Sequence, residues 1–215
     1  MKIFKERILN KQRDKVFLCI VAIFLSLYSA FCLTCFASSA QAVRSDVVRL
    51  HILANSDSEN DQKIKLQVRD ALLEENNKLL SSGVNTENAQ IYFQESKDTI
   101  LKTVENTLKS NGFYYGATVS LEKEYFETRE YDNLTFPAGE YLALKVILGE
   151  GAGKNWWCVM FPPLCVPAAD NVTVEGSISE YTTPAGEKLL YGGEKYVMRF
   201  KILELYEEFI KKLKQ

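Results

Sequence analysis

A long apolar stretch near the start of the chain dominates its hydrophobic pattern. Residues 16–43 contain no charged side chain. Within residues 16–37 the apolar run is broken only by Ser26, Tyr28, Ser29 and Thr34. Because roughly 20 such residues span a bilayer as a helix, we expect residues 16–37 to enter or cross a membrane.

Beyond this stretch, alternating apolar positions predict β-strands. Over residues 46–54, Val48, Leu50 and Ile52 share one face, and Arg49 and His51 share the other. Similar or more continuous apolar patterns predict three further strands, at residues 117–127, 141–148 and 156–161.

Helical spacing of apolar residues separates these strands. A helix is expected over residues 59–80, opened by Ser58 and Asp61 as a capping box. A second helical region is expected over residues 86–110, and its pattern is compatible with a break near residues 95–96.

The last 50 residues of the chain combine a segment without periodicity and a segment with helical periodicity. Residues 166–193 are rich in Gly, Ser, Thr and Pro and predict a mobile loop, whereas residues 194–214 regain helical spacing.

Together these elements predict an α+β fold. We expect one mixed sheet of about four strands flanked by two or three helices. Residues 1–42 form a basic stub with a signal peptide or transmembrane anchor, and residues 43–215 form a single exported domain.

The amino-acid composition excludes several classes of function. The 215 residues are 47% apolar and carry a net charge of −2, without the basic excess usual in nucleic-acid binders. A single His excludes a His-based zinc site within one chain. We expect no metal, no cofactor, no nucleic acid and no small-molecule substrate.

The charge distribution predicts the orientation of the N-terminal segment. Residues 1–15 hold six basic and two acidic side chains, a net charge of +4, which leaves −6 for the rest of the chain. The basic end should stay inside, so that the part after residue 42 is outside the cytoplasm. The small residues around Ala42 fit signal cleavage after that position, but the long apolar run also fits an uncleaved anchor.

Two cysteines lie in the exported part. Cys158 and Cys165 flank a Phe-Pro-Pro turn, and in an oxidising compartment two nearby thiols usually pair. A disulfide and two buried free thiols both remain open interpretations.

His51 is the one candidate for acid–base chemistry. A secreted cell-wall or peptide hydrolase could use it with Asp57 or Glu140. A lone His on a strand that also carries Arg49 is more often structural. Glu122 and Glu124 share a strand face in the same way and are more simply read as solvated.

Adjacent tryptophans point to a partner surface. Trp156 and Trp157 are consecutive in a strand and must face opposite sides of the sheet. One can serve the core, and the other must be covered by something else. Since Trp is enriched at binding hot spots, a protein partner near this strand is expected.

Two segments resemble a known family. They are VRLHILANSD at residues 48–57, continuing through Asp61 to Arg69, and residues 125–165, which include FPAGEY at 136–141 and GEGAGKNWWCVMFPPLC at 149–165. Both are similar to the stage II sporulation protein R family of endospore-forming Firmicutes. The likeness covers most of residues 44–165 and becomes loose after about residue 167.

The resemblance implies a signalling protein, not an enzyme. Members are made in the forespore and secreted across its membrane into the space between the septal membranes. For this chain, an uncleaved apolar segment would instead anchor the domain in the forespore membrane, facing that space. There they activate the membrane-embedded aspartic protease of the mother cell, stage II sporulation protein GA, which then processes pro-sigma-E.

We expect seven residues to be candidates for contact with that partner. They are Asn55, Ser56, Asp57, Asp61, Arg69, Trp156 and Trp157. Helix capping alone is the preferred explanation of the cluster at residues 55–61.

Overall fold

The structure is a computed structural model of the whole chain, and it describes residues 2–80, 88–131, 134–162 and 182–191. The chain divides into two compact units, residues 1–39 and 40–215. The predicted C-terminal helix at 194–214 lies outside the described residues.

The first unit is helical. It belongs to helix α1 (Lys2–Asp46), of which the segment Lys15–Asp46 is long and apolar enough to cross a membrane. Among the residues that the structure describes, no other helix is long and apolar enough to do so. The predicted apolar helix at residues 16–37 is therefore confirmed as an element.

A four-stranded mixed sheet forms the centre of the second unit. Its order is β2 (Ala117–Phe126), β5 (Gly139–Leu148), β1 (Val48–Leu53) and β6 (Asn155–Phe161). Strand β1 runs parallel to β5 and antiparallel to β6, and β2 runs antiparallel to β5. The α+β prediction is confirmed, with strand ends within two residues of those expected.

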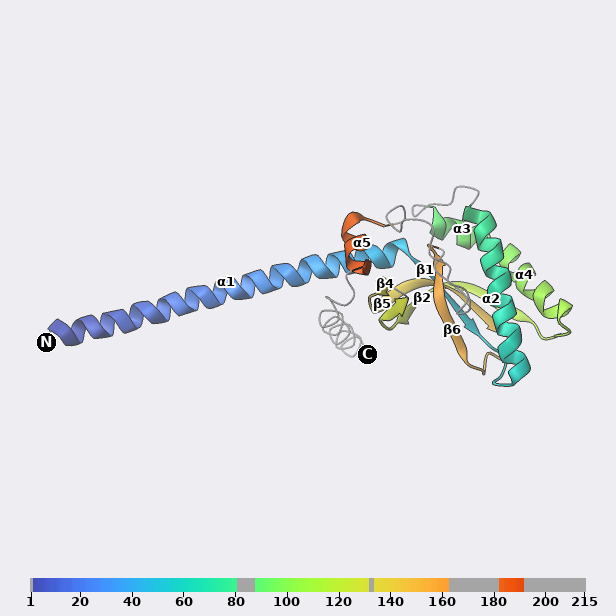
Figure 1. Cartoon of the computed structure of the whole chain (residues 1–215), viewed down its shortest axis with the longest axis horizontal. Helices are drawn as coiled ribbons and strands as arrows, with labels where there is room; N and C mark the ends of the chain where they lie inside the picture. The colour runs from blue at the N-terminus through green and yellow to red at the C-terminus, as the bar shows by residue number, and fades with distance from the viewer. Residues whose placement is uncertain (1, 81–87, 132–133, 163–181, 192–215) are drawn as a thin grey trace. The chain divides into compact units, whose positions relative to one another are not determined.

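Three helices cover one side of this sheet. They are α2 (Glu59–Leu80), α3 (Ala89–Glu95) and α4 (Lys97–Ser110), which Figure 1 shows gathered together. The break between α3 and α4 falls at Ser96, where the helical pattern allowed one. Helix α4 ends at Ser110. Asn111 caps it, and the next residue, Gly112, has a φ of 79°, which suits the left-handed conformation that closes many helices.

The core lies between these helices and the sheet. Alternate residues of β1, namely Val48, Leu50 and Ile52, meet apolar residues of the helices, such as Val68 and Val104. The intervening Arg49 and His51 point to the opposite side. The alternation expected from the sequence is confirmed, because a strand with one wholly apolar face packs that face against the helices.

Small elements complete the second unit. A two-stranded sheet is made by β3 (Arg129–Tyr131) and β4 (Leu134–Phe136), and helix α5 spans Pro184–Tyr191. The prediction of a mobile loop over residues 166–193 is wrong for the eight residues of α5. Its Leu189 and Leu190 are buried, so packing overrides the Gly- and Thr-rich local sequence.

The last turns of α1 belong to the second unit. Ala40 and Val43 are fully buried, and Arg44 donates from Nη1 to the carbonyl oxygen of Ala138 at 2.8 Å. Arg44 lies so close to Gly139 that a Cβ at that glycine would meet its guanidinium. The predicted strand at residues 46–54 therefore begins two residues late, because Asp46 ends the helix.

Candidate functional site

Asp61, on the first turn of α2, is the centre of a buried polar network. Its Oδ2 accepts hydrogen bonds from Asn55 Nδ2 (2.9 Å) and Ser56 Oγ (2.5 Å), and its Oδ1 accepts one from the hydroxyl of Tyr115 (2.8 Å). The backbone N–H of Asp61 donates to Ser58 Oγ, which confirms Ser58 as a cap of α2.

This network sets the ionisation of its members. Burial alone would raise the pKa of Asp61, but the hydrogen bonds from Ser56, Asn55 and Tyr115 outweigh it and hold the pKa below its usual value. Burial, with the hydrogen bond to Asp61, raises the pKa of Tyr115 well above that of a free tyrosine. The carboxylate is therefore ionised and the phenol protonated at neutral pH.

The same loop residues also hold the glycine-rich loop that precedes β6. The backbone N–H of Glu150 donates to Asn55 Oδ1 at 3.0 Å, and that of Lys154 donates to Asp57 Oδ1 at 2.8 Å. A Cβ at Gly153 would lie 2.2 Å from the carbonyl oxygen of Ser56. The loop needs glycine there because the two backbones approach closely.

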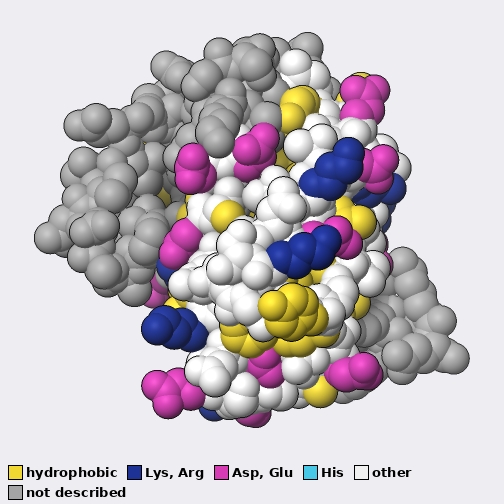
Figure 2. Space-filling model, turned by 90° about the vertical axis from the view of Figure 1, so that its right-hand side faces the viewer, with side chains coloured by type: hydrophobic (Ala, Val, Ile, Leu, Met, Phe, Trp, Pro, Cys, Tyr) yellow, Lys and Arg dark blue, Asp and Glu magenta, His cyan; other side chains and the backbone are white. Residues whose placement is uncertain are grey.

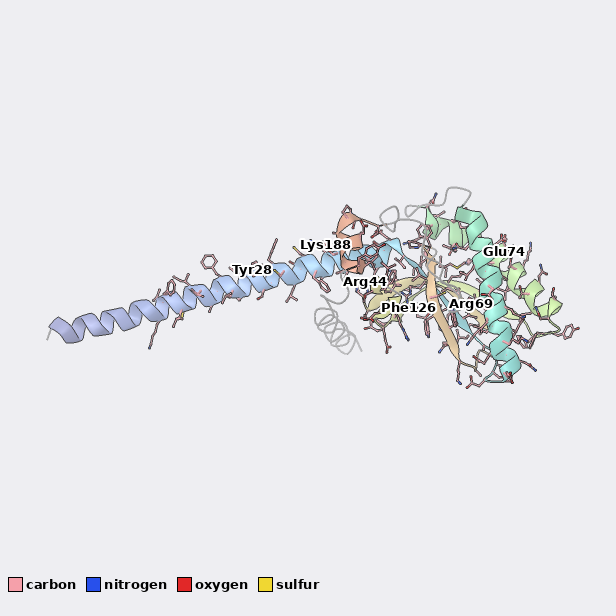
Figure 3. The ribbon with its side chains drawn as sticks, viewed as in Figure 1. Tyr28, Arg44, Arg69, Glu74, Phe126 and Lys188 are labelled. Atoms are coloured by element: carbon pink, nitrogen blue, oxygen red, sulfur yellow. The ribbon has the colours of Figure 1, made fainter. Side chains whose placement is uncertain are left out.

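Arg69 and Trp156 lie together on the helix-covered side of the sheet. The Arg69 guanidinium carbon is 4.5 Å from the Trp156 ring centroid, and its Nε donates to Asp70 at 2.8 Å. Figure 3 shows Arg69 reaching from α2. Trp156 packs against the core. Both residues are thus largely enclosed, unlike typical contact residues.

Lys65 lies one turn before Arg69 and links α2 to the start of β6 through hydrogen bonds. Its ammonium group donates to the carbonyl oxygen of Lys154 at 2.9 Å and to Gln62 Oε1 at 2.7 Å. Burial lowers the pKa of Lys65 from its usual value. The Lys65 amine therefore holds the loop before β6 against helix α2.

Trp157 lies on the opposite side, as the sequence predicted, and stacks on His51. The two ring centroids are 3.5 Å apart with the planes 15° from parallel. His51 contacts Glu124 Oε2 through Nδ1 (2.8 Å) and Asn155 Oδ1 through Nε2 (2.9 Å). Both ring nitrogens are engaged, neither with Asp57 nor with Glu140. The constellation expected for a hydrolase is therefore not assembled around His51.

Two carboxylates of β2 also contact Lys145 on the neighbouring strand β5. Lys145 donates to Glu122 at 2.9 Å and lies 3.5 Å from Glu124. The hydrogen bond to Glu122 and the charge of Glu124 outweigh burial and raise the pKa of Lys145. The interpretation of Glu122 and Glu124 as merely solvated is wrong for Glu124, which links His51 to Lys145.

A pocket opens beside Trp157. Its cavity volume is about 280 Å³, and its lining residues are Tyr125, Phe126, Glu127, Arg129 and Trp157. Phe126 meets Trp157 edge to face at 5.0 Å between centroids. The pocket offers aromatic walls and one charge of each sign, from Glu127 and Arg129.

No arrangement suited to metal chemistry is present in the described part of the chain. There, no group of three or more His, Cys, Asp or Glu residues could hold a metal ion. Cys158 is buried, but Cys165 lies outside the described residues, so the disulfide stays a prediction. Ala42 lies half-buried within α1, and its cleavage stays a prediction as well.

The structure brings four of the seven predicted contact residues together, namely Asn55, Ser56, Asp57 and Asp61. Arg69 and Trp156 form a second pair, and Trp157 lies alone on the other face. Sequence reasoning missed Tyr115 and Asn155, which supply partners to Asp61 and His51. The only available signal was their polar groups at the ends of predicted strands.

Comparison with known proteins identifies a family. The family model described as "Stage II sporulation protein R (spore_II_R)" matches residues 44–171. The Stage II sporulation protein R of Bacillus subtilis (strain 168) is 38% identical over 123 residues, which cover 57% of this chain and 55% of that protein. The match thus spans little more than half of the curated relative. No solved structure matches.

Proposed function

This chain belongs to the stage II sporulation protein R family, and from that membership we propose that its second unit is an extracytoplasmic signalling ligand. It is made in the forespore and carried across the forespore membrane. It then activates the membrane aspartic protease of the mother cell, stage II sporulation protein GA, so that pro-sigma-E is processed.

One observation carries the proposal. The family match covers residues 44–171, from the last turn of the apolar helix through the six strands and helices α2 to α4 of the second unit. A domain that follows a membrane-spanning or signal helix with a basic N-terminal stub is delivered outside the cytoplasm. A family of sporulation proteins with this plan fits a signal that crosses a septum.

The mechanism we propose is a shift of population. A ligand changes the balance between two states of its receptor only by binding one of them better. Turning a receptor from 1% to 99% active needs a difference of about 5.5 kcal/mol between the two affinities. A domain with an internally bonded, rigid surface can supply such a difference without a chemical step of its own.

Reconstitution tests this function. The full chain is co-expressed with the protease and the sigma precursor in a non-sporulating host, and precursor cleavage is followed by immunoblot. We expect cleavage only when the full chain is present. A version lacking residues 1–42, kept in the cytoplasm, should give none because the domain then lies on the wrong side of the membrane. Cleavage without the protein would contradict the proposal.

A further inference from the structure

Three loops meet at one end of the sheet, where β1 and β5 end and β2 and β6 begin. They are residues 54–58, 111–116 and 149–154, and we call them the loop cluster. In open sheets, loops that converge at one end of the strands commonly carry function on a rigid scaffold.

Backbone hydrogen bonds join the three loops to one another. Gly149 N–H donates to Gly116 O (2.9 Å), Gly153 N–H to Ala54 O (2.9 Å) and Ala152 N–H to Asn55 O (3.2 Å). The buried Asp61 adds side-chain bonds to two of them, through Ser56 and Tyr115. The loop cluster is thus held as one piece before any partner arrives.

An exposed aromatic side chain stands on this rigid base. Tyr114 is 89% exposed, whereas its neighbours Phe113 and Tyr115 pack against the core and lie 5.5 Å apart between ring centroids. Figure 2 views the molecule from the side on which α4 ends, and it shows hydrophobic side chains standing out among polar and charged ones. The chain thus packs Phe113 and Tyr115 partly against the core and leaves the Tyr114 ring exposed.

We propose that the loop cluster is the surface by which this domain docks onto its partner protein, with the Tyr114 ring entering an apolar pocket on the partner's extracytoplasmic side. This deepens the proposed function and rests on it. Tyr is among the residues that dominate interface energies. A tyrosine on a pre-ordered loop loses little conformational entropy on binding.

The surroundings of Tyr114 favour a protein over a lipid surface. The exposed charged residues of the loop cluster are Asp57, Glu150 and Lys154, so both signs are present and acidic groups prevail. Binding to an anionic membrane surface needs a basic cluster or a broad apolar face. A single ring among mixed charges instead suits a pocket with a polar rim.

The experiment compares two exposed tyrosines in the full chain. Tyr114→Ala is set against Tyr191→Ala, since Tyr191 is 47% exposed and lies on α5, outside the loop cluster. In the reconstituted system we expect Tyr114→Ala to weaken activation about thirtyfold, the loss of a strong hot spot. Tyr191→Ala should match wild type, and Tyr114→Phe should retain most activity because its ring still fills the pocket.

Folding and binding are read separately from activity. Both alanine variants should unfold within about 2 °C of wild type, because exposed substitutions of this kind change stability little. A photo-crosslinking residue at position 114 should capture the protease, and one at position 191 should not. A crosslink from position 114 to the protease without precursor cleavage would support the docking surface and contradict the proposed activation, so the two failures are distinguishable.

Two results would overturn the docking surface. One is an active, folded Tyr114→Ala variant together with no crosslink from position 114. The other is sedimentation of the full chain with vesicles of phosphatidylglycerol and phosphatidylethanolamine that is lost in Tyr114→Ala, because the tyrosine would then be a membrane contact.

Discussion

Asp61 shows how one residue connects folding to the surface that the domain presents. The residue is only 6% exposed, and a buried charge is tolerated only when it is paired or fully hydrogen-bonded. Three side-chain donors, from Asn55, Ser56 and Tyr115, meet that requirement. The hydrogen bonds that make burial of this carboxylate possible therefore also hold two loops in place.

Asp61→Asn should lower the free energy of unfolding at pH 7 by about 2 kcal/mol, because hydrogen bonds to a charged acceptor become bonds to a neutral amide. The folded-state pKa of Asp61 is lowered, so its contribution is present above the unfolded pKa of about 3.9 and is lost as the pH falls through the folded pKa. Wild type and variant should therefore converge at low pH.

Urea unfolding of the full chain in mild detergent at pH 7 and near pH 3 checks this. Asp98→Asn, at an exposed aspartate on the first turn of α4, is the control and should change stability by less than about 1 kcal/mol. A difference between Asp61→Asn and wild type that stays constant with pH would speak against an ionised, hydrogen-bonded Asp61.

At the scale of elements, β2 offers two glutamates on one face with different surroundings. The Glu124 side chain is 20% exposed and contacts His51, whereas Glu122 is 45% exposed and contacts only Lys145 among the described residues. Glu124→Gln should cost about 1–2 kcal/mol by weakening a partly buried charged contact between β2 and β1.

Glu122→Gln should stay within about 0.5 kcal/mol of wild type, since exposed ion pairs contribute little. Thermal unfolding followed by circular dichroism compares the two variants. Equal losses would mean that the contact of Glu124 with His51 does not stabilise the sheet.

Two glycines of the loop cluster give a second matched pair of variants. Gly153→Ala places a Cβ against the backbone of Ser56 and should cost more than about 2 kcal/mol, because backbone atoms give way only with a shift of the whole loop. Gly116→Ala meets nothing within 4 Å and should be neutral or raise stability by about 0.4–1 kcal/mol, through a less flexible unfolded chain. Chemical denaturation measures both, and a tolerated Gly153→Ala would contradict the close approach.

The elements that sequence alone predicted are those with a strong period. Strand β1 and helices α2 and α4 each carry one continuous apolar face, so their pattern identified them. The short strands β3 and β4 and helix α5 were missed because each is stabilised by packing of a few residues, such as Phe136 and Leu190. Local sequence carries too little periodicity in three to eight residues to reveal them.

The candidate site also has a part that local sequence predicts and a part that only the three-dimensional arrangement determines. Adjacent positions in a strand were enough to place Trp156 and Trp157 on opposite faces. Contacts between segments far apart in sequence, such as His51 with Glu124 or Asp61 with Tyr115, depend on strand order and loop pairing. A single sequence has no signal for either, so these partners emerged only from the structure.

At the scale of the whole molecule, the junction between the apolar helix and the second unit decides which residues would stay with that unit after a signal cleavage. The turns from Ala40 to Asp46 are part of the folded unit through buried Val43 and the bond from Arg44 to Ala138. Cleavage after Ala42 would leave Val43 and Arg44 with the domain. A released and an anchored protein would therefore both retain them.

This integration predicts a difference between two truncated chains. A chain of residues 47–215 should be less stable than one of residues 40–215 by about 3 kcal/mol, since it loses a buried valine and a buried hydrogen bond. For a domain of this size, that loss lowers the midpoint of thermal unfolding by about 6–12 °C. Differential scanning calorimetry of both chains measures it. Equal midpoints would mean that residues 40–46 serve only the membrane helix, and the signalling domain would then begin at β1.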